Sequence, residues 1–174
     1  MPGRWYTAQA PLLSLAAEAF SDHNAQVERI EWLIPDGFFA ADSTEPFVRT
    51  YVAAALHRLA ERAPGATPVV VAKSLGTYAA ALVADRSLPA IWLTPVLTDD
   101  AIVAAITRST APALLIGGNA DRLWSPGAAA STGKTVVTVE GGDHGLRVPG
   151  RLRAYADVLG DVGTAVEDFL VSLP

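Results

Sequence analysis

Ser74 is the residue of this sequence whose surroundings best suit a nucleophile. It lies in the sequence AKSLG at positions 72–76, after the apolar run 67–71 and before a helix-like stretch. A nucleophilic serine on a tight turn between a strand and a helix needs small residues two positions before and after it, because larger side chains would collide there. Ala72 and Gly76 meet this need. The motif alone is weakly specific, so the prediction depends on partners elsewhere in the chain.

A serine hydroxyl is a poor nucleophile unless a base takes its proton, and the chain contains three histidines. His23 falls at the end of one predicted helix and His57 lies within another, where solvated or capping roles are expected. His144 lies in the glycine-rich segment 141–145, directly after the last predicted strand. That position would bring its imidazole to the carboxyl edge of a sheet, so His144 is the predicted base.

A carboxylate must orient such an imidazole and stabilise the cation that forms during attack. Asp121 is the predicted acid, because it follows the strand 113–117 in a glycine-containing turn. Asp99 and Asp100, after the preceding strand, are competing candidates, and Asp143 is a weaker one because it adjoins the base in sequence. A turn-stabilising role is the alternative interpretation of Asp121.

The elements that must position these residues follow from the apolar periodicity. Short apolar runs between helix-length amphipathic stretches predict an α/β fold, a doubly wound and mostly parallel sheet of about five to six strands with helices on both faces. The predicted helices are 11–23, 46–62, 75–85, 99–108 and a terminal helix ending near 173, and the predicted strands are 26–33, 67–73, 90–96, 113–117 and 135–139. In such sheets the ligand site lies at the carboxyl ends of the strands.

Composition narrows the class of protein. The 174 residues suit one domain, 1–174, and 51% of them are hydrophobic. Scattered basic residues and a net charge of −5 argue against a nucleic-acid partner. No apolar run is long enough for a membrane span or a signal peptide, and the absence of cysteine suits a cytoplasmic location. We expect no metal and no cofactor.

Taken together, the ordered Ser74, Asp121 and His144, each following a strand, resemble the catalytic residues of α/β-hydrolases. The resemblance covers almost the whole chain. It is greatest to small lidless bacterial members of the dienelactone-hydrolase and carboxylesterase type, because only residues 94–99 separate the strand carrying Trp92 from the next helix.

The resemblance implies an oxyanion hole made by the backbone amide of Leu75 and one from an early loop, here Arg4 or Trp5. It also implies a strand before that loop, between the strand 26–33 and the nucleophile strand, and this sequence has no such strand ahead of Pro2. An unfilled position would expose strand edges and favour association, so a homodimer is one expected partner.

Four apolar residues in predicted loops suggest an acyl or alcohol pocket, with ordinary loop packing as the alternative; they are Phe38, Phe39, Trp124 and Leu146. Lys73, one of only two lysines, is expected to pair with a nearby carboxylate. The sequence as a whole predicts a serine hydrolase that cleaves a small ester or related acyl compound through an acyl-enzyme. The alternative is a non-catalytic protein of the same fold that binds a ligand or another protein.

Overall fold

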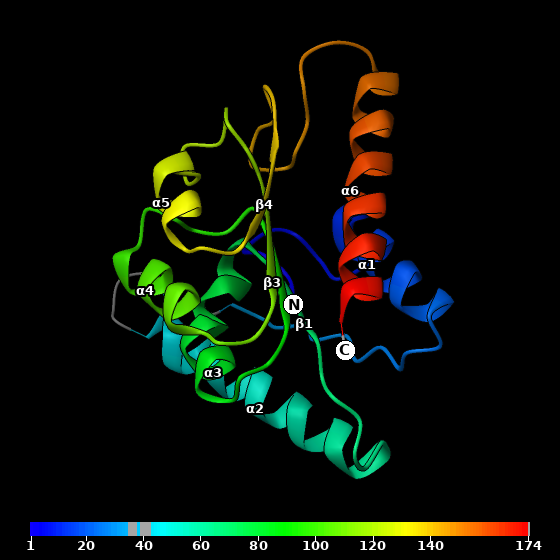
Figure 1. Cartoon of the computed structure of the whole chain (residues 1–174), viewed down its shortest axis with the longest axis vertical. Coiled ribbons are helices and arrows are strands. Elements are labelled where there is room, and N and C mark those ends of the chain that lie inside the picture. Colours follow the sequence, from blue (N-terminus) through cyan, green and yellow to red (C-terminus); the bar gives the residue numbers. More distant parts are fainter. Residues whose placement is uncertain (35–37, 39–42, 174) are drawn as a thin grey trace.

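The computed structural model describes residues 1–34, 38 and 43–173 (Figure 1). Its elements in chain order are α1 (Pro11–Asp22), α2 (Thr44–Arg62), β1 (Val70–Lys73), the 3-10 helix η2 (Ser74–Ala79), α3 (Ala80–Asp85), β2 (Ala90–Leu93), α4 (Asp100–Arg108), β3 (Ala113–Gly118), α5 (Pro126–Ser131), β4 (Thr135–Val139) and α6 (Leu152–Ser172). None of the helices in these ranges is long and apolar enough to cross a membrane.

The four strands form one parallel sheet in the order β1-β2-β3-β4. The predicted α/β class with a parallel sheet is therefore confirmed. The predicted number of five to six strands is wrong for the part of the chain that the structure describes, which contains four. Because the strands are parallel, all four carboxyl ends meet at one edge, and the loops that follow them share that edge.

The sheet is covered on both faces by helices (Figure 1). Every residue of β2 and β3 is buried, which explains their continuous apolar sequences. Side chains alternate between two cores: Trp92 and Leu115 pack with α2, α3 and α4, whereas Ile91 and Leu114 pack with α1 and α6. The helices predicted at 11–23, 46–62 and 99–108 are present within one or two residues.

Two helical features differ from the sequence-based expectation. The helix predicted at 75–85 begins as the 3-10 helix η2 before continuing as α3, and the short helix α5 was not predicted. In α5 the side chain of Ser125 accepts a hydrogen bond from the Ala128 amide and Pro126 occupies the first turn, a recognisable start signal. In α6 the helix continues through Gly163, where α1 packs so closely that an added Cβ would lie 3.3 Å from Leu15 Cδ2.

The strand predicted at 26–33 is wrong. Residues 26–34 are described and form no strand. Residues 26–30 line a cavity whose other side is the edge of β1, so β1 does not lie beside them as a hydrogen-bonding neighbour. A β-strand requires such a neighbour, and the alternation around Val27 and Ile30 therefore does not produce one here.

Candidate active site

Ser74 occupies a strained turn between β1 and η2. Its φ is +49°, in the left-handed region that a non-glycine residue adopts at some energetic cost. The turn is so tight that a Cβ added to Gly76 would lie 3.1 Å from the Cβ of Ala72. As expected from the sequence, Ala72 and Gly76 are small because larger side chains would collide in this turn. The serine is held at the carboxyl end of β1 with 9% of its surface exposed.

Ser74, His144 and Asp121 form one chain of hydrogen bonds. Ser74 Oγ lies 2.8 Å from His144 Nε2, and His144 Nδ1 lies 2.6 Å from Asp121 Oδ2. The three residues come from the loops after β1, β4 and β3, so the parallel sheet brings them to one edge. The His144 side chain is 38% exposed and that of Asp121 is 1% exposed, which leaves the imidazole accessible and its orienting carboxylate buried.

Asp121 is fixed from two sides. Its Oδ1 accepts a hydrogen bond from the Leu123 amide, so it stabilises the local turn while Oδ2 contacts His144. Burial by itself would raise the pKa of the Asp121 carboxyl. The hydrogen bonds from His144 and Leu123, together with the charges of His144 and Lys73, outweigh burial and hold that pKa below its usual value. The Asp121 carboxyl is therefore ionised at neutral pH.

The competing carboxylates have other roles. Asp99 caps α4 by accepting hydrogen bonds from the amides of Ala101 and Ile102. Asp143 accepts from the amides of Gly145 and Arg147 within the loop of His144. Of the candidates named from the sequence, Asp121 is the one that the structure hydrogen-bonds to His144. The other two histidines lie elsewhere: His23 bonds the Ala19 carbonyl and His57 lies beside Glu61.

The loops that carry the acid and the base touch through glycines. Gly118, at the end of β3, packs against the backbone of Gly142, and an added Cβ at Gly118 would lie 2.0 Å from the Gly142 oxygen. The Gly142 carbonyl also accepts a hydrogen bond from the Ala120 amide at 3.0 Å. Backbones can approach this closely only without side chains, so these glycines set the separation of Asp121 and His144.

Lys73 lies beneath these residues and was incompletely predicted from the sequence. Its side chain is 2% exposed, and its Nζ donates hydrogen bonds of 2.9 Å to Thr94 Oγ1 and to the backbone oxygen of His144. It also lies 4.6 Å from the ring centroid of Tyr6. The expected pairing with a carboxylate is not what the structure contains, because the direct partners of Lys73 are a hydroxyl, a carbonyl and an aromatic ring.

Burial lowers the pKa of Lys73 to about 8, and the charges of Asp121 and Asp143 oppose this shift. Burial also raises the pKa of the Tyr6 hydroxyl to about 12, so the ring over which the ammonium sits stays neutral. Sequence reasoning missed Thr94 and Tyr6 entirely. The one available signal for Thr94 was its position directly after β2, at the edge where the loops converge.

The N-terminal loop lies against the nucleophile. A Cβ added to Gly3 would lie 3.3 Å from Ser74 Cβ, and the Gly3 amide bonds the Tyr6 carbonyl to close a tight turn. Leu75 is the second residue of η2, and amides in the first turn of a helix have no partner within that helix. The structure thus brings the loop of Arg4 and Trp5 and the amide of Leu75 to the same turn, while the Trp5 side chain is 85% exposed.

The residues suggested for a substrate pocket are dispersed. Trp124 is buried with its ring stacked on Gly117, and Leu146 is fully buried in the core against α1 and α6. Phe38 packs edge-on against Phe47, with ring centroids 4.7 Å apart. Trp124 and Leu146 thus belong to the cores on opposite faces of the sheet, Phe38 packs at the start of α2, and Phe39 lies outside the described residues.

Within the described ranges, no cluster of three or more His, Asp or Glu side chains suits a metal ion. No protein-family model matches the sequence, and no curated protein matches it. Several solved structures, in contrast, match the fold of the chain.

Several solved structures share the fold over nearly the whole chain. An α/β serine hydrolase homologue from Coxiella burnetii is 13% identical, with a TM-score of 0.68 over 93% of this chain and 77% of that one. A protein described as a hydrolase of the α/β superfamily from Xanthomonas campestris is 17% identical, with a TM-score of 0.67 over 98% and 95%. A lidless α/β serine hydrolase from the same organism is 17% identical, with a TM-score of 0.61 over 98% and 79%.

The chain therefore has the α/β-hydrolase fold. Its β2 strand ends at Leu93 and α4 begins at Asp100, so no lid is inserted between them, as in the lidless structure from Xanthomonas campestris.

Proposed function

We propose that this protein is a serine hydrolase that cleaves a small ester or related acyl compound through an acyl-enzyme. The observation that carries the proposal is the continuous hydrogen-bond chain from Ser74 Oγ through both ring nitrogens of His144 to Asp121. In this arrangement an imidazole can take the serine proton on one side while the carboxylate stabilises the resulting imidazolium on the other. The strained, small-residue turn of Ser74 supports the same reading.

The proposed reaction has two halves. Ser74 Oγ attacks the substrate carbonyl carbon as His144 Nε2 takes its proton, and the tetrahedral oxyanion is bound by the Leu75 amide together with that of Arg4 or Trp5. The tetrahedral species then expels the alcohol, which leaves with the proton from His144. Water, deprotonated by His144, attacks the acyl-serine and releases the carboxylic acid and the free serine hydroxyl.

A fluorophosphonate probe tests this function directly, because it reacts with an activated serine. We expect labelling at Ser74 that disappears in Ser74→Ala and falls strongly in His144→Ala. Hydrolysis of short-chain nitrophenyl esters should be lost in the same variants. His57→Ala is the matched control, because its side chain is exposed on α2 beside Glu61. Equal labelling of wild type and His144→Ala would contradict the proposal.

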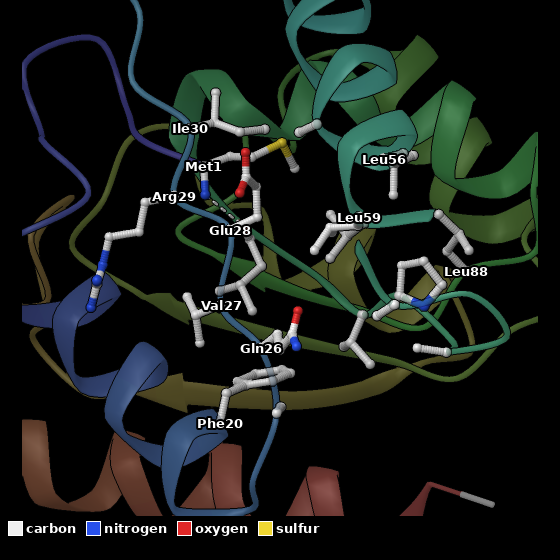
Figure 2. A pocket seen from close by; sticks show the side chains of 18 of the residues that line it. Met1, Phe20, Gln26, Val27, Glu28, Arg29, Ile30, Leu56, Leu59 and Leu88 are labelled. Atoms are coloured by element: carbon white, nitrogen blue, oxygen red, sulfur yellow. Dashed lines mark hydrogen bonds between the residues drawn. The ribbon is translucent and has the colours of Figure 1, made fainter. Parts of the chain in front are cut away.

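A second candidate is a non-catalytic protein of this fold that binds a ligand or another protein. The observation that favours it is a cavity of about 670 Å³ between α1, α2 and the edge of β1 (Figure 2), whose described lining includes neither Ser74 nor His144. The nitrophenyl ester screen separates the two candidates, because equal rates for wild type and Ser74→Ala would favour binding over catalysis.

A further inference from the structure

Thr77 is a fully buried polar residue that the proposed reaction leaves without a role. It lies three residues after Ser74, within η2. Its Oγ1 donates a hydrogen bond of 2.6 Å to the Ser74 carbonyl and accepts one of 3.3 Å from the Val96 amide. The hydroxyl therefore acts as both donor and acceptor, and it joins the turn of the proposed nucleophile to the loop after β2.

The bond that Thr77 donates holds one peptide group of that turn. The carbonyl of Ser74 and the N–H of Leu75 belong to the same peptide group, which is planar, so neither can rotate without the other. This peptide bond is trans, and its C=O and N–H therefore point in opposite directions. By holding the Ser74 carbonyl, the Thr77 hydroxyl also sets the direction of the Leu75 N–H.

Such a constraint matters here because the backbone of Ser74 is strained. Its φ of +49° lies in the left-handed region, and a non-glycine residue stays there only where surrounding contacts hold it. Amides in the first turn of η2 have no partner within that helix, so the helix itself does not orient the Leu75 N–H. A donor stabilises an oxyanion best when it is oriented before the charge develops. Thr77 supplies that orientation.

The bond that Thr77 accepts extends the constraint to the loop of the proposed acid. Val96 precedes Leu97, whose amide donates to the Leu123 carbonyl at 2.9 Å. The Leu123 amide in turn donates to Asp121 Oδ1 at 2.9 Å. Together with the hydrogen bonds among the three proposed catalytic residues, these contacts close a ring that passes through Thr77.

A buried threonine elsewhere in the chain shows what a purely local role looks like. The Oγ1 of Thr132 donates to the Ala129 carbonyl at 2.7 Å and accepts from the Lys134 amide at 3.3 Å. Both partners lie in its own turn, as is common for threonine. Thr77 donates in the same way, but the amide from which it accepts is 19 residues away, in another loop. The two threonines are therefore a matched pair that differs in what the hydroxyl connects.

We propose that Thr77 is a positioning residue that orients the Leu75 amide towards the oxyanion, an inference that rests on the serine hydrolase function proposed above. Because Thr77 is fully buried, it acts through the peptide group of Ser74 and Leu75 and not by contact with substrate. The oxyanion exists in the transition state and not in the bound ester. Loss of the hydroxyl should therefore lower kcat and leave KM nearly unchanged.

Hydrolysis of a short-chain nitrophenyl ester by Thr77→Ser and Thr77→Ala tests the proposal. The two variants lack the same methyl group and differ only in the hydroxyl. We expect kcat of Thr77→Ala to be about 10- to 30-fold below that of Thr77→Ser, with KM values within about twofold of each other. Thr132→Ser and Thr132→Ala are the matched control pair, because Thr132 lies before β4, at the opposite edge of the sheet. Their kcat values should be equal.

A trifluoromethyl ketone inhibitor provides a readout that a purely structural role would not move. Its carbonyl carbon bonds to Ser74 Oγ as His144 takes the serine proton, and the negatively charged oxygen of the adduct mimics the oxyanion. We expect its inhibition constant to be about 10- to 30-fold higher for Thr77→Ala than for Thr77→Ser. Amide hydrogen exchange at Val96 should also be faster in Thr77→Ala, because this amide loses its acceptor.

The outcomes distinguish this inference from the function on which it rests. If a fluorophosphonate does not label Ser74 in the wild-type protein, the proposed function and this inference both fail. If the wild type is labelled but kcat and the inhibition constant are equal in Thr77→Ala and Thr77→Ser, only the positioning role fails. Equal changes in the Thr77 and Thr132 pairs would also overturn that role, because the loss would then follow from removing any buried hydroxyl.

Discussion

The ammonium of Lys73 donates a hydrogen bond of 2.9 Å to the backbone carbonyl of His144, so the residue before the proposed nucleophile holds the loop of the proposed base. The same nitrogen bonds Thr94, which follows β2. One buried side chain thus connects the ends of three strands at the site. Lys73 is a positioning residue in this arrangement, because it acts on the reacting groups through His144.

Replacing Lys73 by methionine should lower kcat for ester hydrolysis by about 10- to 100-fold and leave KM nearly unchanged, because a displaced base impairs chemistry more than binding. Steady-state kinetics with a nitrophenyl ester measures the split. Lys134→Met is the matched control: Lys134 also donates to two backbone carbonyls, those of Ser109 and Ala111, but away from the site. A loss confined to KM, or an equal loss in both variants, would contradict the positioning role.

The same lysine makes stability depend on pH in alkaline solution. Its pKa is about 8 when folded and 10.5 when unfolded, so between these values the unfolded chain binds more protons and the free energy of unfolding rises with pH. The full difference corresponds to about 3 kcal/mol. Denaturant unfolding at pH 7.5 and pH 10.5 should show this rise in wild type relative to Lys73→Met. If the two proteins respond alike, the buried lysine does not titrate as described.

Asp121→Asn should lower kcat by about 10⁴-fold, because an amide cannot stabilise the imidazolium or hold the same tautomer. The fold should persist, since the side-chain oxygen can still accept from the Leu123 amide. Asp99→Asn is the control, because asparagine caps a helix as well as aspartate does. Nitrophenyl ester kinetics distinguishes the two variants. A large loss of kcat in Asp99→Asn would indicate that Asp99 acts as the acid.

The parts of the site that were predictable are those encoded locally. The turn of Ser74 follows from small residues between an apolar run and a helical pattern, and the positions of Asp121 and His144 follow from strands that end just before them. Parallel strands deliver such residues to one edge without further information. The order along the chain therefore predicted which three residues meet, although not their distances.

The errors concern properties that depend on contacts distant in sequence. A strand at 26–33 was a reasonable local prediction, but in the described part of the chain a cavity separates residues 26–30 from the edge of β1. For Trp124 the sequence left a pocket and ordinary loop packing open, and in the structure Gly117 leaves room for its buried ring. Lys73 was expected to find a carboxylate, whereas the fold offers it a carbonyl and a hydroxyl. Residue types can be read from the sequence, whereas the packing of the folded chain determines which residues they contact.

The turn of Ser74 should be intolerant of one added methyl group at Gly76. An alanine Cβ there would lie 3.1 Å from the Cβ atoms of both Ala72 and Met1, closer than nearly all real Cβ contacts, so a neighbour would have to move by a few tenths of an ångström. We expect Gly76→Ala to lower the free energy of unfolding by about 1–3 kcal/mol, measured by denaturant titration. Ester hydrolysis should fall as well, because relief of the contact displaces the Leu75 amide or Ser74.

Gly160→Ala is the control for that substitution, since nothing lies within 4 Å of the added Cβ and the residue is inside α6. Alanine should stabilise this helix by about 0.5–1 kcal/mol through its lower conformational entropy when unfolded. Opposite signs for the two variants would show that steric crowding, and not the intrinsic preference of glycine, dictates the small residue at Gly76. If Gly76→Ala were neutral or stabilising, the close approach of β1 and η2 would not be what constrains the motif.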